Sequence, residues 1–254
     1  MSMGRIVSVA NQKGGVGKTT TALNLSATLA AAEKKTLLVD LDPQGNSTSG
    51  LGVDKHSLPA TVYEVLIGTK RLKEVMQKTE LAYLDLVPAN TTLFGAEVEL
   101  VDIDSRESLL RRSLEEVKGT YEYILVDCPP SLTLLTINAL AAADSILIPI
   151  QCEYYAMEGL GQLLHTIQLA RDKLNPDLEI EGILFTMFDG RNNLSHQVAE
   201  EVRRYFPDKV FQTVIPRNIK LSESPSHGKP VILYDIGCKG AESYLELTKE
   251  ILYS

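Results

Sequence analysis

A glycine-rich turn between a predicted strand and a predicted helix constrains this chain more than any other segment. The run KGGVGKTT, residues 13–20, follows the apolar residues 6–10 and precedes a helical pattern that continues to Ala30. A strand, a glycine-rich turn and a helix start, in this order, form the context in which a phosphate-loop match is meaningful. The glycines let consecutive N–H groups point at one anion, and the helix N-terminus adds its dipole. The segment therefore predicts a phosphate-binding loop in an α/β fold.

The side chains of this loop predict a nucleotide site with a metal ion. Lys18 supplies a point charge for the β- and γ-phosphates, and the Thr19 hydroxyl is a ligand for Mg²⁺. The alternative is a glycine-rich turn that holds no ligand. The predicted nucleotide-binding residues of the loop are Lys13, Gly14, Gly15, Val16, Gly17, Lys18, Thr19 and Thr20.

A second lysine distinguishes this loop from the standard pattern. Gln12 stands where the standard phosphate loop has glycine, and Lys13 comes directly after it. An ammonium group is strongly hydrated and stays in solvent unless an anion needs it. The segment 11–20, NQKGGVGKTT, resembles the deviant Walker A signature of the ParA/Soj group of partitioning ATPases. The resemblance implies that Lys13 reaches across a dimer interface to the partner's nucleotide and acts in catalysis with Lys18. The alternative for Lys13 is a solvated loop lysine.

The length and composition of the chain favour one large domain. With 254 residues, of which 44% are hydrophobic, the chain is long enough for one α/β domain over residues 1–254 and short for two. Its apolar runs are about as long as strands, well short of the roughly 20 residues that cross a bilayer. The N-terminus passes directly into a predicted core strand, which leaves no room for a cleavable signal. These features predict a cytosolic protein without a membrane segment.

Charge and cysteine content argue against several classes of protein. The formal net charge of −8 argues against a generally basic surface that coats nucleic acid, although a local basic patch can still bind DNA phosphates. Cys128, Cys152 and Cys238 are odd in number and widely spaced. That spacing suits neither a disulfide framework nor a paired-cysteine metal site.

Strand-like and helix-like patterns alternate along nearly the whole chain. The alternation is typical of a parallel sheet with crossover helices, so we expect a single doubly wound, mostly parallel α/β sheet flanked by helices. Such sheets bind ligands at the carboxyl ends of their strands. The predicted strands are 6–10, 36–40, 83–87, 121–127, 145–149, 180–187 and 210–215, and further predicted helices are 105–118, 158–174, 193–205 and 239–252.

Two carboxylates follow one another at the end of the second predicted strand. Asp40 and Asp42 are two residues apart, and in an extended chain such side chains point the same way, so both can face the nucleotide pocket. The segment 40–46, DLDPQGN, resembles switch I of ParA/Soj proteins. The resemblance implies that Asp42 positions the attacking water and that Asp40 lies near Mg²⁺, beyond its direct ligands. The alternative is a turn that Asp42 and Pro43 begin and Gly45 ends.

A third acidic strand end completes this group. Apolar residues 124–126 precede Asp127, a Walker B pattern in which the carboxylate holds Mg²⁺ through water. The segment 127–131, DCPPS, resembles switch II of the same family, and its two prolines form a rigid turn that can move as a unit. The alternative for Asp127 is a strand-end residue that caps a helix.

The last predicted core strand leads into a candidate base pocket. The segment 214–218, VIPRN, resembles the family motif that lies against adenine, and the resemblance assigns adenine contacts to Pro216 and Asn218. The alternative is an ordinary strand-to-turn junction. Segments 149–155 and 221–230 also match the family pattern, so the resemblance covers nearly the whole chain. The N-terminal helix-turn-helix extension of some plasmid members is not present in this sequence.

The resemblance implies an ATP-dependent DNA-segregation ATPase, for chromosome or plasmid partitioning, that uses ATP and Mg²⁺ and acts on the nucleoid. ATP would drive a sandwich homodimer that binds double-stranded DNA without sequence preference. Slow hydrolysis, stimulated by a ParB-type centromere-binding protein, would release it. The alternative for each candidate DNA contact is a solvated surface charge. The candidates are Arg191 and Lys220, then Lys229, and with least support Arg203 and Arg204.

Three other classes of protein compete with this interpretation. A MinD-like positioning ATPase ends in a basic amphipathic helix that lies on lipid, whereas residues 242–254 are acidic and lack clustered lysines. An iron–sulfur reductase of the nitrogenase type needs paired cluster cysteines, which Cys128 and Cys152 match poorly. A binding module that holds ATP without hydrolysis is the third class, and Asp42 argues against it.

Overall fold

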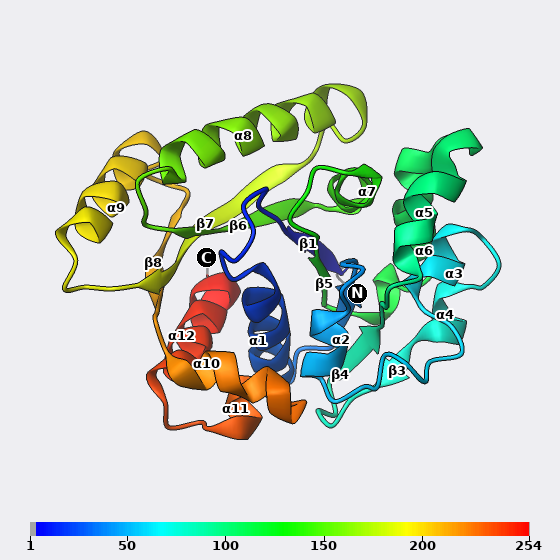
Figure 1. The fold of residues 1–254 in the computed structure, drawn as a ribbon, viewed down its shortest axis with the longest axis horizontal. Helices are drawn as coiled ribbons and strands as arrows, with labels where there is room; N and C mark the ends of the chain where they lie inside the picture. Colours follow the sequence, from blue (N-terminus) through cyan, green and yellow to red (C-terminus); the bar gives the residue numbers. More distant parts are fainter. Residues whose placement is uncertain (1–3, 254) are drawn as a thin grey trace.

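The computed structural model describes residues 4–253, which form an eight-stranded sheet with helices on both faces (Figure 1). The strand order is β3-β4-β2-β5-β1-β6-β7-β8, and every neighbouring pair is parallel except β3 and β4. The predicted doubly wound, mostly parallel sheet is therefore confirmed. The strands are β1 (Arg5–Val9), β2 (Thr36–Asp40), β3 (Gln77–Lys78), β4 (Leu84–Val87), β5 (Tyr123–Asp127), β6 (Ser145–Gln151), β7 (Glu179–Phe188) and β8 (Val210–Pro216).

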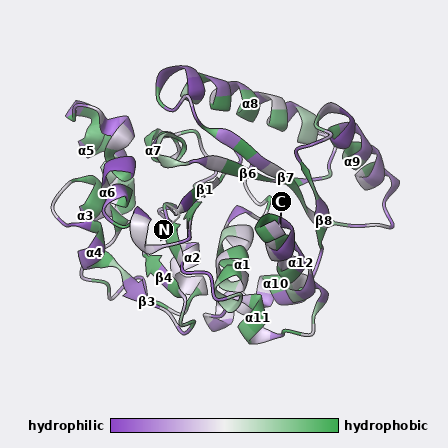
Figure 2. Ribbon diagram, turned by 180° about the vertical axis from the view of Figure 1, so that it is seen from behind, coloured by the Kyte–Doolittle hydropathy of each residue, from purple (hydrophilic) through white to green (hydrophobic). Residues whose placement is uncertain are grey.

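Helices cover both faces of this sheet, so its strands carry apolar side chains on both sides. In β1, Ile6 belongs to the core on one face, and Val7 and Val9 belong to the core on the other. Helices α1 and α12 pack on the face of Val7, and α7 and α8 on the face of Ile6 (Figures 1 and 2). The α-helices are α1 (Lys18–Ala31), α2 (Asn46–Gly50), α3 (Val62–Leu66), α4 (Leu72–Val75), α5 (Leu93–Glu99), α6 (Leu109–Glu115), α7 (Leu134–Ala142), α8 (Ala156–Lys173), α9 (Asn193–Tyr205), α10 (Ile219–Glu223), α11 (Val231–Tyr234) and α12 (Lys239–Tyr253).

One predicted helix, 105–118, is wrong as a continuous element. The chain there forms a 3-10 turn at Arg106–Ser108, then α6, and a second 3-10 turn at Lys118–Thr120. The buried Asn138 explains the break: its amide donates to the Arg106 carbonyl (2.8 Å) and accepts from the Leu110 N–H (3.1 Å). These two backbone groups would bond each other in a continuous helix, and Asn138 satisfies both instead.

The carboxyl ends of β1, β2 and β5 meet at one edge of the sheet. Asp40 and Asp127 are directly opposite each other in the β2–β5 register, and Val9 of β1 is opposite Asp127 on the other side. The phosphate loop leaves β1 at this edge and leads into α1. The three acidic strand ends and the glycine-rich loop therefore share one location. Among residues 4–253, no helix is long and apolar enough to cross a membrane.

Candidate nucleotide site

The phosphate loop has the backbone shape that anion binding requires. Gly15 and Gly17 have φ values of 74° and 83°, in the left-handed region that disfavours residues with a Cβ. Gly17 is the N-cap of α1 and has no side chain to cap the helix, so the first N–H groups of α1 point into the loop. The Lys18 ammonium donates to the carbonyl of Lys13 (3.0 Å), which holds it across the loop.

Side chains from elsewhere fix the loop in this shape. The Thr186 hydroxyl, at the end of β7, contacts the carbonyls of both Val16 (2.8 Å) and Ile150 (3.0 Å). The side-chain oxygen of Asn11 accepts from the Lys13 N–H (3.0 Å), and the side-chain amide of Asn11 donates to the Pro149 carbonyl in β6 (2.8 Å). Both Thr186 and Asn11 are buried. The loop is therefore tied to β6 and β7 before any ligand binds.

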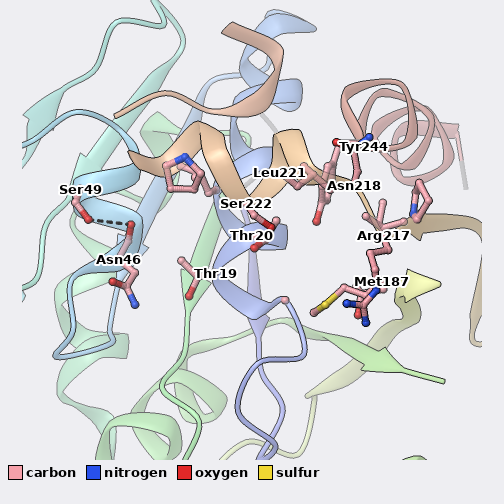
Figure 3. Close-up of a pocket in the computed structure, with 16 residues that line it drawn as sticks. Thr19, Thr20, Asn46, Ser49, Met187, Arg217, Asn218, Leu221, Ser222 and Tyr244 are labelled. Carbon is pink, nitrogen blue, oxygen red and sulfur yellow. Dashed lines mark hydrogen bonds between the residues drawn. The ribbon is translucent and has the colours of Figure 1, made fainter. Parts of the chain in front are cut away.

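Two cavities meet at the start of α1. One of about 350 Å³ is bordered by the phosphate loop, Asp42, Gln44 and Pro130. The other, of about 380 Å³, is bordered by Pro216, Asn218 and neighbouring residues (Figure 3). The two cavities share Gly17, Thr19, Thr20, Asn46 and Met187. Together they form one elongated depression, polar and glycine-lined at one end and partly apolar at the other.

The two strand-end carboxylates are held by the short helix α2. The Ser47 hydroxyl donates to Asp127 Oδ2 (2.7 Å), and the Thr48 N–H and hydroxyl donate to Asp40 Oδ2 (2.8 and 2.7 Å). The Thr48 oxygen also accepts from the Ala89 N–H (2.9 Å), at the end of β4. All four polar residues are fully buried. Sequence reasoning missed Ser47 and Thr48, since α2 is too short to show a helical period.

Burial controls the acidity of this pair. Loss of solvent raises the pKa of Asp127, and the adjacent Asp40 carboxylate raises it further, while the Ser47 and Thr19 hydroxyls act in the opposite direction. Burial also raises the pKa of Asp40, against the hydrogen bonds from Thr48 that lower it. Two negative charges side by side in the interior are unfavourable, and a cation would relieve them.

Asp40 and Asp42 lie in different settings, although they are only two residues apart. The strand β2 ends at Asp40, and the chain then turns, with the Gly45 N–H donating to the Asp42 carbonyl (2.9 Å). The two-residue alternation of a strand therefore stops before it reaches Asp42. Asp40 is fully buried and lines neither cavity, whereas Asp42 lines the phosphate cavity.

The residues at the phosphate end fit a magnesium ion. Among the described residues, Asp127 Oδ1 is the only carboxylate oxygen that is buried without a hydrogen-bond partner. Asp127 itself lines neither cavity, but the Thr19 hydroxyl, which acts on its carboxylate, lines the phosphate cavity. Carboxylate and hydroxyl oxygens are the ligands that Mg²⁺ prefers. Burial lowers the pKa of Lys18, and the carboxylates of Asp127 and Asp42 raise it, so one ammonium faces two acids.

The other end of the depression contains the predicted base contacts. Pro216 and Asn218 both line the larger cavity, as the sequence predicts. The Asn218 side-chain oxygen also caps α10, since it accepts from the Lys220 N–H (2.9 Å). Sequence reasoning missed Met187 and Arg217, which border the same cavity (Figure 3). Met187 has φ of 47°, which is unusual for a residue with a Cβ and places it at both cavities.

Lys13 lies outside the phosphate cavity. Its ammonium forms an ion pair with Glu153 (2.5 Å), which is on the segment between β6 and α8. Both side chains are about half exposed, at 42% and 52%. Lys13 is therefore available at the surface, held by an ion pair of the kind that contributes little to stability.

Each of the three main candidate DNA contacts has an acidic neighbour; Arg191 is exposed, whereas Lys220 and Lys229 are partly buried. Arg191 forms a two-pronged pair with Asp189, with both distances at 3.0 Å. This pair lowers the pKa of Asp189 to about 2. Lys220 pairs with Glu223 (3.0 Å), and Lys229 approaches a glutamate on the β3–β4 loop at 4.0 Å.

Arg191 lies on the loop after β7, and Lys220 lies in α10, which follows the neighbouring strand β8. The Arg217 N–H, just before α10, donates to the carbonyl of Phe188, just before the Arg191 loop (3.3 Å). Of the weaker candidates, Arg203 on α9 lies over the ring of Phe185 in β7, 5.1 Å from the ring centroid. A backbone hydrogen bond thus joins the segments that lead to Arg191 and to Lys220, and Lys220 itself lies 5.4 Å from the centroid of the Tyr234 ring.

Comparison with known proteins connects this geometry to a family. A family model described as an AAA domain matches residues 4–180. The solved structure of cobyrinic acid a,c-diamide synthase from Mycobacterium smegmatis, with bound ADP and magnesium, has a TM-score of 0.86 and 39% identity, and the match covers 98% of this chain and 94% of that one. The cell division ATPase MinD of Pyrococcus furiosus has a TM-score of 0.82 and 26% identity, with 98% and 99% covered.

Two curated relatives are more similar in sequence. The chromosome partitioning protein ParA of Myxococcus xanthus is 60% identical over 251 residues, which are 99% of this chain and 89% of that protein. The sporulation initiation inhibitor protein Soj of Bacillus subtilis is 58% identical over 249 residues, which are 98% of each chain. With this similarity over nearly its whole length, the chain belongs to the ParA/Soj family of chromosome-partitioning ATPases.

Proposed function

We propose that this chain binds ATP with Mg²⁺ and hydrolyses the nucleotide to ADP and phosphate. The observation that carries the proposal is the pair of cavities that meet at Gly17, Thr19 and Thr20, with a phosphate loop at one end and Pro216 and Asn218 at the other. A nucleoside triphosphate matches this arrangement, because it has charged phosphates at one end and a partly apolar base at the other. The relative of known structure with ADP and magnesium supports this choice of ligand.

We assign each residue at the phosphate end of the depression a separate role in hydrolysis. Lys18 and the N–H groups at the start of α1 bind the phosphate oxygens and stabilise the charge that develops on them. Thr19 directly, and Asp127 through water, would hold Mg²⁺, which when bound offsets charge on the β- and γ-phosphates. Asp42, which is only 7% exposed and lines this cavity, orients the water that attacks the γ-phosphate.

ATP drives homodimer formation in this proposal. Lys13 exchanges Glu153 for the phosphates of the partner's nucleotide, so that each nucleotide becomes part of the interface. Because ATP then has a higher affinity for the dimer than for the monomer, binding shifts the equilibrium toward the dimer. Hydrolysis removes the γ-phosphate and returns the protein to the monomer.

The dimer binds double-stranded DNA without sequence preference. Arg191 comes from the loop after β7 and Lys220 from α10 after β8, and their largely and partly exposed side chains can exchange a carboxylate for a DNA phosphate at low cost. Lys229 is a third, more distant contact. A ParB-type partner speeds the otherwise slow hydrolysis and releases the DNA. The cycle moves or positions chromosome or plasmid DNA.

The proposal is tested by fluorescence anisotropy on a random-sequence duplex with ATP, ADP and no nucleotide, with Asp42→Ala to preserve the ATP state. We expect binding with ATP alone. With about five phosphates neutralised per dimer, log K should fall with log salt with a slope of roughly −4 to −5. Binding that ignores the nucleotide, or a flat response to salt, would contradict the DNA part of the proposal.

A matched pair of substitutions locates the DNA contact. Arg191→Glu should abolish DNA binding while sedimentation still shows the ATP dimer. Lys73→Glu, an equal change of charge on the exposed face of α4, is the control and should leave binding nearly unchanged. If the two variants lose affinity equally, net charge rather than this loop governs binding.

A further inference from the structure

The helix α5 and the 3-10 turn Leu100–Asp102 that continues it have two apolar faces, and only one is buried. Leu93, Ala96 and Leu100 point into the core and are fully buried. Phe94, Val98 and Val101, at positions i, i+4 and i+7, are 59%, 75% and 54% exposed. We call these three residues, with the neighbouring Ile103, the α5 stripe; Ile103 is 37% exposed. Outward apolar side chains at this spacing are typical of a helix that packs against another helix.

The α5 stripe lies in an acidic setting. Residues 94–104 contain four acidic and no basic residues, namely Glu97, Glu99, Asp102 and Asp104. Among the described residues, neither Asp102 nor Asp104 takes part in an ion pair, and both are exposed. Two cations lie nearby: Arg106 pairs with Glu107 and donates to the Val101 carbonyl, and Arg112 donates to the Ser105 carbonyl, but neither pairs with Asp102 or Asp104. An apolar stripe edged with uncompensated acids is complementary to a cationic amphipathic segment.

The negative charge around the α5 stripe also indicates which kind of partner can bind there. A second copy of this chain would bring the same acids against each other, and the whole chain carries a net charge of −8. Helix α5 lies at the margin of the molecule in both views, to one side of the loop from which Lys13 would reach a second protomer (Figures 1 and 2). The charge therefore favours a basic partner over self-association through this face.

A short chain of contacts joins α5 to the nucleotide site. The segment that leads from β4 into α5 begins at Ala89, whose N–H donates to the Thr48 hydroxyl oxygen (2.9 Å). Thr48 in turn donates to Asp40 (2.7 Å) and belongs to α2, three residues after the turn that starts at Asp42 and ends at Gly45. A displacement of α5 would reach the Asp42 turn through these groups and through Lys55, whose carbonyl accepts from the Asn90 amide (3.3 Å) and whose ammonium donates to the Gln44 carbonyl.

We propose that the α5 stripe is the docking surface for a cationic amphipathic helix of the partner that stimulates hydrolysis. This inference rests on the proposed function, and it adds the place and the chemistry of the contact. The apolar face of the partner's helix covers Phe94, Val98 and Val101, and its lysines or arginines face Asp102 and Asp104. Docking acts on hydrolysis through Ala89, Thr48 and the Asp42 turn.

The test measures ATP hydrolysis with the purified ParB-type protein of the same organism as the probe, at several partner concentrations. Phe94→Ser with Val98→Ser removes apolar surface, and Asp102→Lys with Asp104→Lys reverses the charge. All four side chains are exposed, so the fold and the unstimulated rate should be unchanged. We expect each double variant to need roughly tenfold more partner for half-maximal stimulation.

The matched control is Ile236→Ser with Tyr253→Ser, since these apolar side chains are also 69% and 86% exposed but lie on the α12 side of the molecule. The control should be stimulated like the unaltered protein. Equal stimulation of all variants would overturn the α5 docking surface and leave the proposed function intact. A partner that fails to stimulate the unaltered protein would overturn the partner step itself, before any substitution is made.

Sedimentation with ATP tests the other explanation of the stripe, namely that it is a contact between two copies of this chain. If the α5 variants form the ATP dimer less readily while the partner's concentration dependence is unchanged, the stripe is a contact between two copies and the proposal is wrong. If dimer formation is unchanged and only the partner's effect is lost, the docking surface is supported. Raising the salt concentration should weaken the partner's effect on the unaltered protein more than on the charge-reversed variant.

Discussion

Two groups of charged residues in this molecule are held in opposite ways. The buried carboxylate cluster sits beneath α2, where every group is fully buried and hydrogen bonds are 2.7–2.8 Å long. The surface cations are partly or largely exposed and each faces a single acid of the same chain. The cluster consists of Asp40, Asp127, Ser47 and Thr48, and the surface cations are Lys13, Arg191, Lys220 and Lys229.

The difference corresponds to two kinds of binding. Groups that hold the nucleotide must be in place beforehand, because reorganisation in the interior is costly and a buried polar group without a partner loses about 1–3 kcal/mol. Cations that bind macromolecules must exchange an intramolecular carboxylate for an anion of the partner. Weak, exposed ion pairs suit this exchange because they cost little to break. The following predictions, from the largest effect to the smallest, test this contrast.

Lys18→Ala should lower ATP hydrolysis roughly 10²–10³-fold, since it removes a charge placed against the phosphates. Burial disfavours the charged form of Lys18 and lowers its pKa, so we expect urea unfolding to show no loss of stability. Steady-state phosphate release measures the first effect. Lys34→Ala, in an exposed pair with Glu122, is the control and should keep full activity.

Ser47→Ala should destabilise the nucleotide-free protein by about 1–3 kcal/mol, because Asp127 Oδ2 is left buried without its donor. Ser57→Ala removes an exposed hydroxyl that bonds only a local carbonyl, and should cost less than about 0.5 kcal/mol. Urea unfolding of both variants measures the difference. Ser47→Thr retains the hydroxyl and should recover most of the loss; equal losses at Ser47 and Ser57 would contradict the contrast.

The pH dependence of stability should reveal the buried acids. A carboxyl whose pKa is raised by folding binds protons more tightly in the folded state, so the free energy of unfolding falls as pH rises above about 4, the ordinary carboxyl value. In EDTA, we expect Asp127→Asn to lessen this fall and to be the more stable protein by more than about 1 kcal/mol at neutral pH. Unfolding curves between about pH 5 and pH 8 measure it. Parallel curves for the two proteins would show that Asp127 ionises freely.

Glu223→Gln should have the smallest effect, and in the favourable direction. It frees Lys220 from an exposed pair, so affinity for DNA should rise by less than about fivefold. Anisotropy titration at low salt measures the change, and Glu242→Gln, which frees Lys239 on α12, is the control. A rise much larger than fivefold would mean that surface pairs restrain DNA binding strongly.

The sequence predicts the sheet well, since buried apolar runs of strand length and a glycine-rich turn leave few alternatives. It places Asp42 and Asp127 beside the phosphate loop, and Pro216 and Asn218 beside the larger cavity. It fails where one residue replaces a regular hydrogen bond or ends an element early. Asn138 interrupts the helix predicted at 105–118, and the turn after β2 starts at Asp42, so that Asp42 lines the phosphate cavity and Asp40 does not.

Other features have no local signature. Helix α2 is five residues long and β3 is two, too short to show periodicity. The contact of Ser47 with Asp127 joins residues 80 positions apart, and Met187 reaches the site through an unusual backbone angle. The roles of Lys13 in a partner protomer and of Arg191 on DNA stay predictions, because they concern contacts with other molecules.

The Thr186 hydroxyl, which touches the Val16 and Ile150 carbonyls at once, has a kinetic consequence. A phosphate loop that is already tied to two strands does not need to fold around its ligand, so nucleotide capture should proceed near the rate of a rigid docking encounter. Discrimination between ATP and ADP then appears in how long each stays bound. The lifetime of the bound state, rather than the speed of loading, would set the timing of the cycle.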